Sequence, residues 1–162
     1  MAQDLEKIQT DRLMLRGINE TDALEIVEWR SDPEVYRFFK NPHKISVKEH
    51  FNWYNSSYVV NQRRFDWMCI EKASGKKIGV FGLGKNDDYC EVNYLLAPEA
   101  QHKGYAAESI NALIQYAKEK WHVERIVAEI HRDNAPSIAL VQRIGFKLVA
   151  QKEQFELYAI EE

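Results

Sequence analysis

A strand pattern that runs through a glycine-containing turn into a long helix pattern constrains this chain most. Residues 89–96 alternate between polar and apolar side chains, as in a strand with one buried face. The segment Gln101-His102-Lys103-Gly104-Tyr105-Ala106-Ala107-Glu108 follows. Apolar residues then recur at helical spacing, at Ile110, Leu113, Ile114 and Ala117. The sequence therefore predicts a strand, a tight turn and a helix in direct succession.

The turn is a candidate anion site. The first backbone N–H groups of a helix have no partner within the helix and lie at the positive end of its dipole, where diphosphate groups commonly bind. Gly104 allows close approach of the backbone to a phosphate, and His102 and Lys103 add positive charge. A single glycine in such a turn is weak evidence by itself, because an ordinary helix start has the same form.

The wider pattern resembles the GCN5-related N-acetyltransferases, the GNAT family. Residues 101–106, after a strand that ends in residues 94–98, are similar to the acyl-CoA pyrophosphate loop of that family. Asn134-Ala135-Pro136-Ser137 and Ile144-Gly145-Phe146 stand where the family has its Asn-x-x-Ser and Gly-Phe signatures. The resemblance runs from Thr10 to about Tyr158 and implies the GNAT fold, with acetyl-CoA as the acyl donor.

The resemblance also implies which residues hold acetyl-CoA. Backbone groups of Leu95, Leu96 and Ala97 are expected to pair with the pantetheine arm as an added strand. Such a strand leaves a backbone N–H to stabilise the oxyanion. The remaining expected contacts lie in the turn and at the next helix start: Gln101, His102, Lys103, Gly104, Tyr105, Ala106, Asn134 and Ser137.

Glu91 is the candidate general base. It stands in Glu91-Val92-Asn93-Tyr94, where the family often has Glu-x-Gly-Tyr, and it is a charged residue in an otherwise apolar strand. An ammonium acceptor is mostly protonated at neutral pH, so the reaction needs a group that removes its proton. The alternative is an exposed glutamate on an edge or face of the sheet, and alternation does not settle which face it occupies.

The family's frequent general acid, a tyrosine four residues before Gly-Phe, is absent, because that position is Val141. Ser137 is the candidate to assist the leaving thiolate, either directly or through water, unless the reaction uses no acid. Asn134 and Ser137 also suit a helix N-cap and first turn. The departure at Val141 motivates an alternative reading, in which the chain binds acyl-CoA without catalysis.

Composition and length narrow the class of protein. We expect a single domain over residues 1–162, and a formal net charge of −3 gives no electrostatic reason for a nucleic-acid or membrane partner. The first ten residues lack a signal-peptide pattern, which makes the cytoplasm the default location. The five histidines show no metal-binding spacing, so no metal is assigned. The sequence leaves open whether two chains form a homodimer.

The order of predicted elements is strand, three helices, three strands, helix, strand, helix and two strands. This order predicts an α/β (α+β) fold, with a mixed, twisted sheet of about six to seven strands and helices on both faces. The predicted helices are residues 21–30, 33–39, 47–60, 105–121 and 134–144. The predicted strands are residues 12–16, 66–71, 77–84, 89–96, 125–130, 146–149 and 155–160. Glycines at 79, 82 and 84 indicate a bulge or a close backbone approach.

The helical third, from about residue 21 to residue 60, is rich in aromatic residues that either form core or wall an acceptor pocket. The opening segment of the resemblance, residues 12–35, is similar to the ribosomal-protein and polyamine branch of the acetyltransferases, and residues 41–53 more weakly resemble enzymes that act on nucleotide-linked amino sugars. Arg30, Arg37 and Lys40 are candidates to meet a sugar-nucleotide diphosphate.

The sequence therefore predicts an acetyl-CoA-dependent N-acetyltransferase in which a primary amine attacks the thioester directly. The acceptor is predicted to be a small molecule such as an amino sugar. The alternatives are a polyamine, a protein amino terminus, or a non-catalytic acyl-CoA-binding domain.

Overall fold

The computed structural model describes residues 5–161, which form one eight-stranded sheet in the order β1-β2-β3-β4-β5-β6-β8-β7. All neighbouring strands pair antiparallel except β5 and β6, which are parallel. The strands are β1 (Ile8–Gln9), β2 (Leu13–Gly17), β3 (Arg64–Glu71), β4 (Lys77–Lys85), β5 (Cys90–Leu96), β6 (Arg125–His131), β7 (Lys147–Lys152) and β8 (Phe155–Glu161).

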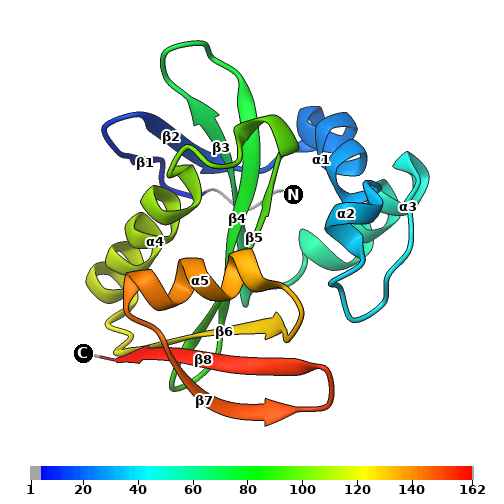
Figure 1. Ribbon diagram of the computed structural model, residues 1–162. Helices are drawn as coiled ribbons and strands as arrows, with labels where there is room; N and C mark the ends of the chain where they lie inside the picture. The colour runs from blue at the N-terminus through cyan, green and yellow to red at the C-terminus, as the bar shows by residue number, and fades with distance from the viewer. Residues whose placement is uncertain (1–4, 162) are drawn as a thin grey trace.

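Helices cover both faces of the sheet (Figure 1). One face carries α1 (Ala23–Arg30), α2 (Pro33–Tyr36) and α3 (Val47–Trp53), and the other carries α4 (Tyr105–Trp121) and α5 (Ala135–Ile144). Short helical turns lie at Glu20–Asp22, Tyr54–Tyr58 and Pro98–Ala100. Within residues 5–161, no helix has the length and apolar character that a membrane crossing requires.

Alternation along β3 separates the two faces. Trp67 and Cys69 point toward α4, where the Trp67 ring lies 5.3 Å from that of Tyr116 and Cys69 Sγ lies 3.5 Å from Ser109 Oγ. Arg64 and Asp66, one step out of phase, point toward α1–α3 instead. The period of two in the strand therefore directs Trp67 and Cys69 to the core under α4 and the charged residues Arg64 and Asp66 to the opposite face.

The two central strands β5 and β6 diverge. They pair only at Cys90 with Ile126 and at Glu91 with Val127, although β5 continues to Leu96 and β6 continues to His131. Figure 1 shows β6 and β8 running at a steep angle to β4 and β5. Beyond Glu91, the edge of β5 that faces away from β4 is therefore not paired with β6.

The structure confirms the predicted fold class, a mixed sheet flanked by helices. The eighth strand is β1, whose two residues are too few to produce a detectable alternation. The predicted helix over residues 33–39 is wrong in extent, because α2 ends at Tyr36. The helix predicted over residues 47–60 ends as an α-helix at Trp53 and continues as a π-helical segment over Tyr54–Tyr58.

The predicted close backbone approach occurs at Gly82, in the middle of β4. A Cβ atom at Gly82 would lie 2.0 Å from Asp66 Oδ1 and 2.9 Å from Asn93 Oδ1. Asp66 and Asn93 are the cross-strand neighbours of Gly82 on β3 and β5. The missing side chain at Gly82 thus leaves room for two polar side chains to lie over the sheet.

We predict that Gly82→Ala destabilises the fold by about 1–3 kcal/mol, the usual cost of inserting atoms into a packed site. Gly84→Ala is the matched control on the same strand and face, where an added Cβ would meet nothing closer than Glu91 at 3.9 Å. Urea unfolding of the two variants measures the difference. Equal stability of the two variants would contradict the close approach at Gly82.

Candidate active site

A cavity of about 560 Å³ opens on the sheet face that carries α1–α3. Its floor is made by residues of β3, β4 and β5, and its walls come from the helical third and from β6 and β8. Aromatic side chains contribute much of the wall: Phe38, Phe39, Trp53 and Phe155. Tyr94 also borders the cavity, at the gap beside β5. Aromatic walls with a few polar groups are typical of sites for small molecules.

Charged groups line the same cavity, and most of them are paired. Lys40 Nζ lies 2.5 Å from Glu129 Oε1, and Arg64 Nε lies 3.0 Å from Asp66 Oδ2. The second oxygen of Asp66, Oδ1, is buried and has no hydrogen-bond partner in the part of the chain that the structure describes. Burial raises the pKa of Asp66, although the charge of Arg64 and its hydrogen bond oppose this. The cavity therefore offers a carboxylate oxygen as well as paired charges.

Glu91 lies where β5 and β6 separate, and it faces the cavity side of the sheet. It is two residues before Asn93, which lines the cavity, so alternation places both side chains on one face. Burial raises the pKa of Glu91, and the charge of Glu129 raises it further, while Lys40 and Arg64 oppose both. A half-buried carboxyl with a raised pKa is suited to accept a proton near neutral pH.

Tyr94 and Ser137 meet on the opposite face of the sheet. The Tyr94 hydroxyl lies 2.5 Å from Ser137 Oγ, and its ring stacks on Phe81, with the centroids 5.6 Å apart. Burial raises the pKa of Tyr94, and the hydrogen bond with Ser137 lowers it in part. Val141 is 1% exposed and belongs to the core. The structure thus supplies a tyrosine hydroxyl beside Ser137, although position 141 has none.

The predicted capping role of Asn134 is present. Asn134 is the N-cap of α5, and its Oδ1 accepts a hydrogen bond from the Ser137 backbone N–H at 3.4 Å. This bond fixes the first turn of α5 relative to the loop before it. The side chain of Ser137 remains available to Tyr94, so a capping role for Asn134 and a site role for Ser137 coexist.

The backbone of β5 narrows the expected set of cofactor contacts. The Ala97 N–H donates to the Ile78 carbonyl at 2.8 Å, so this group is already used within the sheet. Antiparallel pairing alternates, so the polar groups of Leu95 also face β4, whereas those of Tyr94 and Leu96 face the gap beside β6. Tyr94 and Leu96 therefore carry the free backbone edge.

The turn between β5 and α4 has the predicted form. Gly104 has φ +81° and serves as the N-cap of α4 without a side-chain cap, and His102 also has a positive φ of 64°. Gln101, His102 and Lys103 are exposed, and Ala106 lies in the first turn of α4. The first N–H groups of α4 consequently face outward from this turn, as an anion site requires.

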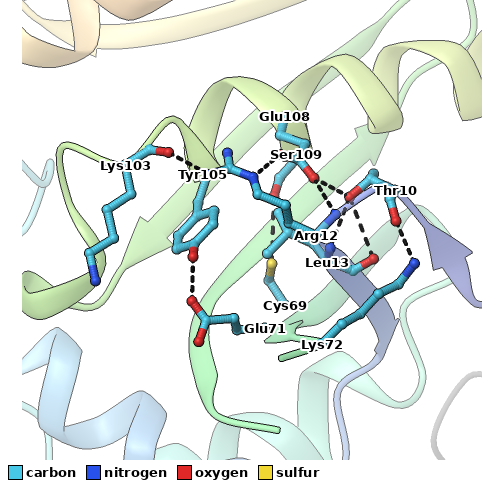
Figure 2. Close-up of polar contacts among 10 residues, drawn as sticks. All are labelled: Thr10, Arg12, Leu13, Cys69, Glu71, Lys72, Lys103, Tyr105, Glu108 and Ser109. Atoms are coloured by element: carbon cyan, nitrogen blue, oxygen red, sulfur yellow. Dashed lines mark hydrogen bonds and ion pairs between the residues drawn. The ribbon is translucent and has the colours of Figure 1, made fainter. Parts of the chain in front are cut away.

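An ion-pair network, shown in Figure 2, holds the turn against the start of the chain. Glu108 accepts hydrogen bonds from the Arg12 backbone N–H at 3.1 Å and from Arg12 Nε at 2.8 Å, as well as from Thr10 Oγ1. Arg12 also donates to the Lys103 carbonyl at 2.9 Å and lies 4.4 Å from the Tyr105 ring centre. Glu108 therefore has a structural role.

The side chain of Tyr105 also takes part in this network. Its side chain is only 7% exposed, and its hydroxyl donates a hydrogen bond to Glu71 (Figure 2). The expected contact of Tyr105 with the cofactor is therefore limited to its backbone, at the start of α4.

The structure brings the sequence-predicted residues together around one gap in the sheet. Glu91 lies at its apex, residues 94–97 along one edge, and Ser137 beside Tyr94. Sequence reasoning missed Tyr94, Asp66 and Glu129 as site residues. The sequence signal for Asp66 was a charged residue within a mainly apolar strand that precedes a glycine-rich strand. No local sequence signal marked Tyr94 as the neighbour of Ser137.

Comparison with known proteins agrees with this geometry. A family model described as the acetyltransferase (GNAT) domain matches residues 12–147. The chain belongs to the GNAT family and is an N-acetyltransferase, an enzyme of the class that transfers an acetyl group from acetyl-CoA to an amine.

The individual proteins that are similar to this chain have low sequence identity to it. The chain is 28% identical over 145 residues to YoaA, an uncharacterised N-acetyltransferase of Bacillus subtilis, which covers 86% of this chain and 82% of YoaA. A spermidine N-acetyltransferase from Vibrio cholerae, solved with CoA and spermine, superposes with a TM-score of 0.82 at 19% sequence identity. The match covers 94% of this chain and 96% of that protein's chain. RimL, a ribosomal L7/L12 α-N-protein acetyltransferase solved with coenzyme A, has a TM-score of 0.83 at 18% identity, with 96% and 98% covered. These two structures share the fold.

Proposed function

We propose that this chain acts as a single GNAT domain that acetylates the primary amine of a small molecule bound in the 560 Å³ cavity. One observation carries the proposal. The cavity lies on one face of the sheet, Tyr94 and Ser137 lie on the other, and the two sides meet where β5 and β6 separate beside Glu91. A thioester in that gap is accessible to an amine from one face and to a hydroxyl from the other.

The donor arm fits along the free edge of β5. The backbone groups of Tyr94 and Leu96 are available to pair with pantetheine amides, in the manner of a strand added to a sheet. From there the arm leads to the turn at residues 101–106, whose outward N–H groups suit the diphosphate. The same edge would supply a backbone N–H to the developing oxyanion.

The reaction needs one proton removed and one delivered. The amine nitrogen attacks the carbonyl carbon of the thioester, the carbon–sulfur bond breaks, and the thiolate leaves. We assign Glu91, directly or through a water molecule, to accept the proton of the amine, because its carboxyl is half-buried at the apex of the gap.

The pair Tyr94 and Ser137 is assigned to the leaving thiolate. A thiol has a pKa of about 8.5, so the thiolate leaves with modest assistance, and a hydroxyl pair that shares one short hydrogen bond is sufficient. This assignment keeps the role predicted for Ser137 and adds Tyr94 as the group that donates the proton.

The acceptor is proposed to be an amino sugar or a similar small amine. The C–H faces of a sugar ring pack against aromatic walls, and Phe39, Trp53 and Phe155 provide such walls here. A polyamine is the second candidate, favoured by the unpartnered oxygen of Asp66 and by Glu129 in the same cavity.

We expect Glu91→Gln to lower turnover by roughly 10²–10⁴-fold and to leave the affinity for acetyl-CoA unchanged, because only the proton acceptor is lost. In the wild type, the raised pKa of Glu91 means that kcat/KM falls with decreasing pH already above roughly pH 4.3, the ordinary value for glutamate. Thiol release followed across pH measures both effects. An unchanged rate at saturating substrate would remove Glu91 from the mechanism.

Tyr94→Phe is expected to lower turnover by less than the roughly 10²–10⁴-fold typical of a general acid–base residue, because thiolate is a tolerable leaving group. Ser137→Ala should have a smaller effect, since the Tyr94 hydroxyl remains. Tyr116→Phe is a control on the same sheet face, next to Trp67 and away from Ser137. If Tyr94→Phe retains full turnover while Ser137→Ala does not, the proton comes from Ser137.

The acceptor class is tested by competition among an amino sugar, spermidine and a peptide with a free amino terminus, at equal concentrations, with products resolved by mass. We expect the amino sugar to be acetylated in preference. Preferential acetylation of spermidine would establish the polyamine alternative. Binding of acetyl-CoA without thiol release for any amine would indicate the non-catalytic reading.

A further inference from the structure

Among the described residues 5–161, Arg30 is the charged residue of the cavity lining that makes no ion pair or hydrogen bond. Lys40 is paired with Glu129, and Arg64 is paired with Asp66. Arg30 lines the same cavity at the end of α1. The charged groups of the lining therefore leave one guanidinium without an ion-pair partner.

Burial and a neighbouring like charge act against the cation at Arg30. Its guanidinium is half-buried and lies over the Phe39 ring, 5.5 Å from the ring centre, a contact that favours the cation. Burial lowers the pKa of Arg30, the charge of Arg64 lowers it further, and the charge of Glu49 opposes both. A guanidinium stays protonated regardless, so its charge persists in a place where desolvation and a like charge both disfavour it.

A second polar group in the wall is also without a partner. His50 is 3% exposed, lines the cavity, and its Nδ1 has no hydrogen-bond partner within the described residues 5–161. Burial lowers the pKa of His50, and the charge of Arg30 adds to this, so the ring is neutral at pH 7. In the tautomer that protonates Nδ1, this nitrogen is a hydrogen-bond donor. Two polar groups in one wall, the Arg30 guanidinium and His50 Nδ1, thus lack hydrogen-bond partners among residues 5–161.

The other basic residue expected to meet a diphosphate does not contribute. Arg37 is absent from the cavity lining; its side chain is 57% exposed, pairs with Glu34 at 3.4 Å and covers the Phe38 ring at 4.4 Å. The prediction that Arg30, Arg37 and Lys40 act together is thereby reduced to Arg30, since Lys40 is held by Glu129.

We propose that the acceptor carries, in addition to its amine, an anionic group that binds Arg30. Carboxylate and phosphate both match the planar fork of a guanidinium through paired hydrogen bonds, and either would supply the missing counter-charge. The inference rests on the proposed function, because it concerns the acceptor of that reaction. Arg30 is then a specificity-determining residue, and a polycation is disfavoured by the same charge.

The test compares acceptors that differ only in the anion. Glucosamine is paired with glucosamine 6-phosphate for the phosphate arm, and 4-aminobutanamide with 4-aminobutyrate for the carboxylate arm. The anionic member of at least one pair is expected to have a kcat/KM about 10- to 100-fold higher, the range that a charge-assisted hydrogen-bond pair supplies. Arg30→Gln should lower kcat/KM for the anionic member far more than for the neutral member, which removes the preference, and Arg37→Gln should preserve the preference.

Arg30→Lys separates charge from geometry and guards against misfolding of the glutamine variant. It retains the charge but loses the fork, so an intermediate preference is expected. The inference is overturned if the neutral members or spermidine are the better acceptors, or if Arg30→Gln leaves the preference unchanged. The transferase reading survives both results.

If no acceptor is acetylated, the proposed function fails, and binding decides the inference separately. Calorimetric titration of the CoA-saturated protein with inorganic phosphate and with 4-aminobutyrate then gives the readout. Binding of either probe to the wild type that is lost in Arg30→Gln supports the anion site. Binding of neither probe, or equal binding to both proteins, overturns it.

Discussion

The unpaired edge of β5 is the constraint on which the rest of the structure depends. Backbone N–H and C=O groups inside a sheet are almost always paired, and leaving them unpaired away from water costs free energy. Here β5 and β6 pair at only two positions before they diverge, so the groups of Tyr94 and Leu96 face a gap in the centre of the sheet. A substrate arm that contains amides can satisfy them.

The divergence of β5 and β6 also explains how side chains with different proposed roles lie on opposite faces of the same sheet. Alternation along β5 directs Glu91 and Asn93 toward the cavity and Tyr94 toward α5. The proposed proton acceptor Glu91 and the proposed proton donor Tyr94, three positions apart on one strand, therefore lie on opposite sides of the gap. On the cavity side, the bare backbone of Gly82 lets Asp66 and Asn93 lie over the sheet, which keeps this part of the floor polar.

Sequence reasoning predicted the order of strands and helices along the chain and the turn at Gly104, and it named Glu91 as a candidate base, because each depends on local periodicity or on a motif of adjacent residues. It could not place Tyr94 beside Ser137, which are 43 residues apart in the sequence and meet only when α5 packs across the end of β5. The charge on Arg30 was visible in the sequence. That Arg30 lacks an ion-pair partner among residues 5–161 could not be predicted, because it depends on the pairing of Lys40 with Glu129 and of Arg64 with Asp66. The ends of α2 and α3 were also missed. At the end of α3, the Tyr58 ring packs against those of Trp53 and Tyr54, a tertiary arrangement that helix propensity does not report.

The family pattern places a tyrosine general acid on α5, whereas the hydroxyl assigned to that role in this chain lies on β5. Val141 is buried in the core, so a larger side chain there would have to displace packed neighbours, and this helix position is used for packing. In the proposed mechanism the hydroxyl comes instead from Tyr94 of the strand, and the Ser137 residue that meets it is held by the Asn134 cap at the start of α5. The geometry of the donor pair consequently depends on the N-terminus of α5. An altered cap at Asn134 would thus affect the leaving-group side of the reaction before it affected the base at Glu91, which lies on the other face of the sheet.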